Sequence, residues 1–228
     1  MTTASRAHVY GDASGLPLAP IPVVDEAAFL DAAIAGALWT GSRLLLAMLS
    51  FLFGTLVFSY FYLRSINSHG LWRLPGQHPP MYIGVAVLVC TVGAAAVNYV
   101  GVRRLRNQGL AADWRVGTGA ALFLCLLAGG LSIWQLGRTN FLPGSSGFAG
   151  VFVAWQPAFA VVLAGAAYWL ETLLARSLRL RWVLSTGTSE VGTLPPEVTS
   201  FRGSVDGCSV LLGFLACVEV IGFLLFFT

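Results

Sequence analysis

Residues Leu44 to Arg64 read LLLAMLSFLFGTLVFSYFYLR, and this run decides the fold class because it holds no acidic or basic side chain before its last residue. About 20 apolar residues, each rising about 1.5 Å, are needed for a helix to cross roughly 30 Å of hydrocarbon. Five stretches of the chain meet this length. The pattern therefore predicts five transmembrane helices, at about residues 38–63, 81–101, 116–136, 148–174 and 207–228.

Composition supports the same class: 57% of residues are hydrophobic and only 10% are charged, well below the share of charged residues in soluble domains. A transmembrane β-barrel would need alternating segments of about ten residues, whereas these apolar runs are continuous. We therefore expect an all-α polytopic bundle, with one membrane domain over residues 37–228.

Residues 1–36 precede the first predicted crossing and lack the basic start, apolar middle and cleavage site of a secretory signal. We expect them to remain as a cytoplasmic tail. Pro and Gly up to Pro22 indicate an extended segment, and Asp25 and Glu26 begin a helical pattern. That pattern either leads into the first crossing or forms an interfacial helix on the membrane surface.

All thirteen basic residues are arginines, so their distribution alone predicts the orientation. Ten of them fall at the N-terminal side of the first crossing or in the second and fourth loops, and three fall in the first and third loops. By the positive-inside rule the N-terminus is cytoplasmic and the C-terminus lies outside. The net charge of +3 then follows from membrane orientation, and no nucleic-acid partner is expected.

Residues with metal-binding side chains do not gather in the crossings. The four cysteines, Cys90, Cys125, Cys208 and Cys217, lie in or at the edge of apolar runs without a CxxC pair, which favours packing. The three histidines, His8, His69 and His78, lie in the tail or the first loop, with a weak surface metal site as the less favoured alternative for the last two. Because haem and copper take imidazole ligands, we expect this chain to bind no metal or redox cofactor.

Few strongly polar side chains lie inside the crossings, and the candidate site residues are Glu219, Gln156 and Asn98. Counted from Gly207, Glu219 lies about 18 Å deep. A carboxylate is costly in lipid, so an intramembrane glutamate is a functional candidate and its neutral form is favoured. Two readings stay open: a structural hydrogen bond to an unnamed partner, or a proton or lipid-headgroup site.

The third crossing carries small residues four positions apart, Gly117, Ala121, Cys125 and Gly129, which predicts a face for close helix packing. Large aromatic side chains lie mostly toward the ends of the crossings, and we expect them to anchor at the membrane interface: Tyr99, Trp114, Trp134, Trp155, Tyr168 and Trp169. No GxSxG, HExxH or GxxxxGK[ST] motif is present, so no catalytic residue is assigned.

Five segments together show a pattern known from another family: FLFGTLVFSYFYLR (51–64), the loop LWRLPGQHPP (71–80), AAAVNYVGVRRLRNQG (94–109), SIWQLGRTNFLPGSSGFAGVFV (132–153) and AFAVVLAGAAYWLETLLAR (158–176). Through these segments the chain resembles subunit III of cytochrome c oxidase, a haem-copper oxidase, as a divergent five-helix member. It departs from the family pattern at Leu49 and Ser50, where the family usually carries an acidic residue. Gln156 is the nearest polar group where the family has paired histidines.

The resemblance implies a non-catalytic accessory subunit in a bacterial cytoplasmic membrane. Such a subunit binds the haem-copper subunit I from the side, takes phospholipid as its candidate ligand, and helps to sustain proton delivery. Haems and copper would belong to partner chains. The alternatives are an accessory subunit of a nitric oxide reductase, a small stand-alone transporter, and an oxidase assembly factor.

Overall fold

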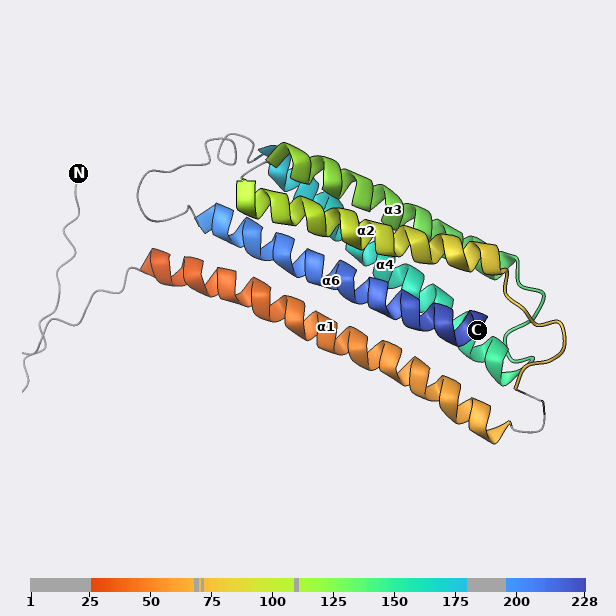
Figure 1. Ribbon diagram of the computed structural model, residues 1–228. Coiled ribbons are helices and arrows are strands. Elements are labelled where there is room, and N and C mark those ends of the chain that lie inside the picture. Colours follow the sequence, from red (N-terminus) through yellow and green to blue (C-terminus); the bar gives the residue numbers. More distant parts are fainter. Residues whose placement is uncertain (1–25, 68–69, 71, 109–110, 180–195) are drawn as a thin grey trace, which may run out of the picture.

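The computed structural model describes residues 26–67, 70, 72–108, 111–179 and 196–228 (Figure 1). These residues form five long helices: α1 (Glu26–Ile66), α2 (Met81–Gln108), α3 (Ala111–Gly137), α4 (Gly147–Arg179) and α6 (Pro196–Phe227). Each is long and apolar enough to span a membrane. The predicted all-α bundle with five candidate crossings is therefore confirmed.

The helices are longer than the apolar runs that predicted them. α2 continues to Gln108 and α6 begins at Pro196, so much of the loop expected between Arg176 and Asp206 is helical. Apolar runs mark only the part of a helix that lies in hydrocarbon, whereas backbone hydrogen bonding continues into the polar flanks. Residues 26–36 likewise belong to α1 without a break. The predicted extended tail and His8 and His69 lie outside the described residues.

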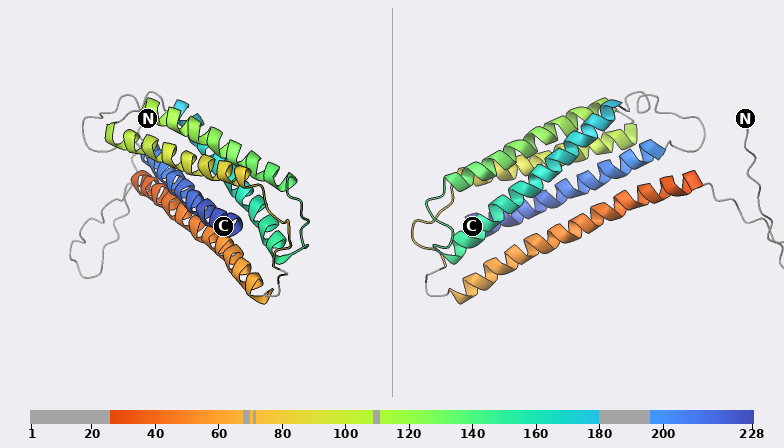
Figure 2. Two further views of the ribbon diagram at one scale, coloured as in Figure 1. Left: turned by 45° about the vertical axis from the view of Figure 1, so that its right-hand side comes forward. Right: turned by 180° about the vertical axis from the view of Figure 1, so that it is seen from behind.

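α4 and α6 each pack against three other helices: α4 against α1, α3 and α6, and α6 against α1, α2 and α4. α2 and α3 form the most extensive pair, and α3 also packs on α4. α1 lies at the edge beside α6, as two opposite views show (Figures 1 and 2). In the most apolar stretch of α1 only 17% of the residues are buried, whereas 50% are buried in the corresponding stretch of α4.

One end of the bundle, which we call the basic end, gathers the arginine-rich termini of α2, α3, α4 and α6. Arg104 Nη1 lies 2.9 Å from Asp113 Oδ2, and Arg106 forms a second ion pair with Asp206. Arg115 Nη2 donates a hydrogen bond to the Ser177 carbonyl at 3.1 Å. These contacts join α2 to α3, α2 to α6 and α3 to α4 at the same end.

An aromatic core fills the other half of the bundle. Trp155 of α4 contacts Phe53 of α1 and Phe226 of α6, with ring centroids 5.2 and 5.7 Å away. Trp114 lies at the basic end, edge-on to Phe201 at 5.4 Å. Both tryptophans are only 1% exposed, so the predicted interfacial role is wrong for these two. Neighbouring helices extend past both positions, so the two rings pack inside the bundle.

The loops opposite the basic end are joined by side-chain hydrogen bonds. Gln77 Nε2 donates to Ser145 Oγ at 2.9 Å, and its Oε1 accepts from Ser146 Oγ at 2.6 Å. Arg73 lies 4.5 Å above the Phe148 ring and its Nη2 is 2.6 Å from His78 Nδ1. Partial burial lowers the pKa of Arg73, although an arginine remains charged at physiological pH.

We predict that Gly222→Leu destabilises the bundle, because a Cβ at this position would lie 2.8 Å from the Trp155 ring. Trp155 is held between Phe53 and Phe226, so it has little room to move. Overpacking of this kind typically costs about 1–3 kcal/mol. Thermal unfolding in detergent should show a lower Tm than for Gly130→Leu, a control whose added Cβ has nothing within 4 Å. Equal melting temperatures would contradict this packing.

The orientation predicted from the arginines can be checked by cysteine labelling. Arg103→Cys, at the basic end, should react with a membrane-impermeant maleimide only after the cells are opened. Arg138→Cys, at the opposite end, should react in intact cells. The parent chain, whose cysteines lie within the helices, is the control for background labelling. The reverse pattern would place the basic end outside.

Candidate functional site

Several polar side chains inside the helices are almost fully buried, and we call five of them the buried polar set. Their residues are at most 4% exposed. They come from four helices: Asn98 of α2, Thr118 and Gln135 of α3, Gln156 of α4 and Glu219 of α6. Three of them are the candidate residues predicted above, whereas Thr118 and Gln135 were not included.

Contacts between α3 and α4 set the relative height of two members of this set. Gly129 faces Leu163, with 3.8 Å between the position of a Cβ and Leu163 Cδ2, and Arg115 is bonded to Ser177. Both contacts give one antiparallel register. In that register Gln135 lies opposite residues 156–157, so the two buried glutamines are at the same level.

The contacts of α6 with α4 give a second register. Gly222 lies against Trp155 and Gly207 against Trp169. Glu219, one turn before Gly222 on the same buried face, then lies opposite residues 157–158. The fold therefore brings Gln135, Gln156 and Glu219 to one level of the bundle, on three different helices.

Asn98 does not join them. Arg106 pairs with Asp206 and Gly84 lies against Phe227, which aligns α2 antiparallel to α6. In this register Asn98 lies opposite residues 213–214 of α6, about 9 Å nearer the basic end than Glu219. The three predicted site residues therefore separate into the pair Gln156 and Glu219 and the isolated Asn98.

Several atoms of the buried polar set lack hydrogen-bond partners among the described residues: Asn98 Nδ2, Thr118 Oγ1, Gln135 Nε2 and Oε1, and Gln156 Oε1. Pro157 adds an acceptor at this level, because a proline within a helix has no N–H for the carbonyl four residues earlier, here that of Val153. A buried polar atom without a partner typically costs about 1–3 kcal/mol. The level of Glu219 is therefore rich in unpaired acceptors and donors.

A neutral Glu219 suits this environment. A carboxylic acid both donates and accepts, so it can serve amide oxygens and amide nitrogens. A carboxylate accepts only, and the described residues place no cation in hydrogen-bond or ion-pair contact with Glu219. The geometry favours a neutral carboxyl at a level where Gln135 Nε2 and Oε1 and Gln156 Oε1 lack hydrogen-bond partners among the described residues.

The small-residue ladder of α3 divides between two neighbours. Gly117, Ala121 and Cys125 are buried, and Gly129 is partly exposed. A Cβ on Gly117 would lie 3.3 Å from the Val97 carbonyl oxygen and 3.5 Å from Gly101 Cα. The ladder thus meets α2 at its basic end, whereas Gly129 meets α4. The close α2–α3 crossing also depends on Gly101, a partner that the spacing within α3 did not indicate.

No group of three or more His, Cys, Asp or Glu side chains with metal-binding geometry occurs among the described residues. The four cysteines are free thiols, and Cys125 and Cys208 are buried. His78, the described histidine of the loop between α1 and α2, lies within hydrogen-bond distance of Arg73.

No protein-family model matches this chain, and no curated protein matches it either.

We predict that Glu219→Gln leaves the free energy of unfolding within about 0.5 kcal/mol of the parent, because an amide replaces a neutral carboxyl with similar shape and hydrogen bonding. Chemical unfolding in detergent measures this change. Glu171→Gln, an exposed glutamate of α4, is the matched control. A loss above about 1 kcal/mol for Glu219→Gln alone would mean that the carboxyl is ionised and paired.

Proposed function

We propose that this chain is a non-catalytic accessory subunit of a respiratory haem-copper oxidase, similar to subunit III, in a bacterial cytoplasmic membrane. In this role it binds the oxidase subunit I laterally and helps to keep it stable during turnover. Haems and copper are held by the partner chains. The proposal rests on the resemblance of several segments to that family and on one observation about α1.

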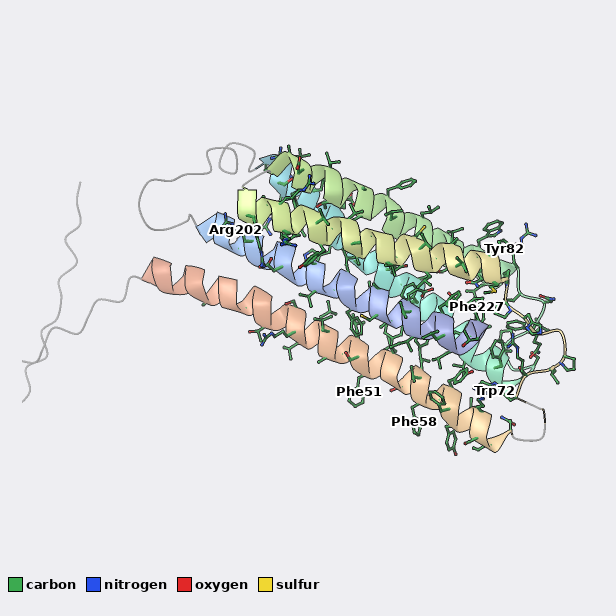
Figure 3. The ribbon with its side chains drawn as sticks, viewed as in Figure 1. Phe51, Phe58, Trp72, Tyr82, Arg202 and Phe227 are labelled. Carbon is green, nitrogen blue, oxygen red and sulfur yellow. The ribbon has the colours of Figure 1, made fainter. Side chains whose placement is uncertain are left out.

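That observation is the outward face of α1. The helix contacts the bundle through a narrow strip that contains Leu49, Phe53 and Tyr60. On the opposite side Phe51 is 82% exposed and Phe58 is 67% exposed, and Figure 3 shows both projecting away from the other helices. Gly54 lies between them with nothing within 4 Å of an added Cβ.

This face suits a partner helix. In lipid, helices associate by close van der Waals packing, and small residues let two backbones approach. Its hydroxyls do not impede packing, because Ser50 Oγ and Thr55 Oγ1 each donate to the carbonyl four residues earlier at 2.8 Å. Gly54 supplies the close approach, and the two flanking phenylalanines supply contact area. We call residues Phe51, Gly54 and Phe58 the α1 outer face.

A small transporter is the second candidate, and the buried polar set is the observation that favours it. Polar groups gathered at one level within a bundle are typical of substrate or ion sites. A transporter would act without an oxidase partner, so the two proposals differ in what the purified chain carries with it. An accessory subunit of a nitric oxide reductase or an assembly factor differs in the identity and the stoichiometry of the partner.

The first test is to purify the tagged full chain from its native membrane in mild detergent. We expect haem bands in the reduced-minus-oxidised spectrum and a large membrane partner at one-to-one stoichiometry. Haem bands together with a nitric oxide reductase as the copurified partner would make this chain an accessory subunit of that enzyme instead. A substoichiometric oxidase would indicate an assembly factor. A colourless preparation without a partner would overturn the proposal.

The α1 outer face can be tested separately by Gly54→Trp, which places a bulky ring where a partner backbone would approach. We expect at least about a tenfold loss of copurified haem, equivalent to about 1.4 kcal/mol of binding. Gly130→Trp and Gly165→Trp are matched controls on α3 and α4, each exposed and with open space around the added side chain. A loss with either control and none with Gly54→Trp would assign docking to another face.

A further inference from the structure

Three hollows surround the basic end of α2. The largest, of about 430 Å³, lies between α2 and α3 and is lined by Ala96, Val97, Val100, Gly101, Arg104, Asp113, Val116 and Gly117. Two others, of about 320 and 340 Å³, share Tyr99, Arg103 and Asn107. These three residues are exposed, and each is four positions after the one before it, so they form one stripe along α2.

The largest hollow is a groove created by glycine. Gly101 and Gly117 bring the two helix backbones together, since a Cβ on Gly101 would be 3.5 Å from Trp114 Cα. Neither glycine has a side chain that could fill the surface above this crossing. The flanking walls are exposed valines, with Val100 at 49% and Val116 at 74%. The groove is therefore apolar along its length and faces the surroundings of the bundle.

The polar end of the groove carries unbalanced positive charge. Arg104 is paired with Asp113, and Arg106 with Asp206. Arg103 has no acidic partner among the described residues, and it lies between the two smaller hollows. Arg106 lies in the last turn of α2, where its positive charge interacts favourably with the negative end of the helix dipole. Arg103 is thus an additional cation beside the groove, because it lines a smaller hollow that shares Val100 and Arg104 with the groove.

The dimensions fit one class of ligand. From Val97 to Arg104 is about 10 Å along the helix axis, so an apolar chain can lie in the groove while an anionic group meets Arg103. Tyr99 and Asn107, one turn to either side, offer hydrogen bonds to phosphate oxygens. Basic side chains at the end of a membrane span attract anionic lipid headgroups.

We propose that this groove and the stripe Tyr99, Arg103 and Asn107 bind one anionic phospholipid, with its phosphate at Arg103 and an acyl chain between α2 and α3. The stripe also adjoins α6, because one of the two smaller hollows is lined by Asp206, Ser209 and Val210 of that helix. The site does not involve the α1 outer face. The inference is independent of the proposed function.

The probe is dioleoyl phosphatidylglycerol, titrated against the delipidated full chain in detergent and followed by native mass spectrometry. Dioleoyl phosphatidylcholine, with the same chains and no net charge, is the comparison lipid. We expect phosphatidylglycerol to bind more tightly, and Arg103→Gln to weaken it about fivefold, the factor for one basic side chain near a headgroup. Arg103→Lys should retain most of the affinity.

Matched variants distinguish a site from general attraction. Arg138→Gln removes the same charge at the opposite end of the bundle and should leave binding unchanged. Val116→Trp should fill the groove and weaken binding, whereas Val161→Trp, equally exposed on α4, should not.

Three results would overturn the proposal. Equal losses with Arg103→Gln and Arg138→Gln would indicate bulk electrostatics. Full binding with Val116→Trp would mean that no acyl chain lies in the groove. Displacement of the lipid by inorganic phosphate alone would make this a site for free anions. Melting temperatures of all variants, measured without lipid, control for loss of fold.

Discussion

Backbone hydrogen bonding in hydrocarbon is the constraint on which the rest of this structure depends. Each peptide group must find its partner within its own helix, so the chain forms long uninterrupted helices that continue past their apolar runs. Among the described helices, Pro157 is the one residue in a helix interior that has no backbone N–H to donate. It leaves the Val153 carbonyl without its usual partner, at the level where Gln135, Gln156 and Glu219 also lie.

Once the helices have formed, side-chain volume decides how they fit. Glycines admit close neighbours at several places, among them Gly101 and Gly117 where α2 crosses α3, Gly207 beside Ser42 and Trp169, and Gly222 beside Trp155. In lipid there is no hydrophobic force between helices, so such close contacts supply the packing energy. The packing of α6 against three helices follows, since its glycines let α1 and α4 approach while α2 is held by the ion pair at Asp206.

Packing and chemistry are divided along the length of the bundle. The half away from the basic end holds an aromatic core around Phe53, Trp155 and Phe226, together with the level of Glu219. The basic end holds ion pairs, the glycine crossing of α2 and α3, and the groove beside Arg103. Rigid aromatic packing isolates the buried polar groups from the surroundings, whereas the open end presents charge where lipid headgroups lie.

Several features could be predicted from the sequence because they depend on order along the chain alone. Five apolar runs of sufficient length predict five helices, and the arginines mark one set of helix ends. Glu219, Gln156 and Asn98 are recognisable as polar residues within apolar runs. Gly117, Ala121 and Cys125 are recognisable as a packing face from their spacing. None of these inferences requires knowing which helix lies beside which.

Only the tertiary structure decided which faces meet. Hydrocarbon accommodates every apolar face equally, so these helices are apolar all round and their inward sides are not marked by polarity. That is why Trp114 and Trp155 pack inward although they resemble interfacial anchors, and why Phe53 is buried while Phe51 and Phe58 face outward. It is also why Gln135 joins Gln156 and Glu219 while Asn98 does not. Helix registers set by glycine contacts and by the Arg115–Ser177 hydrogen bond place these three residues at one level, and such registers exist only after the helices have packed.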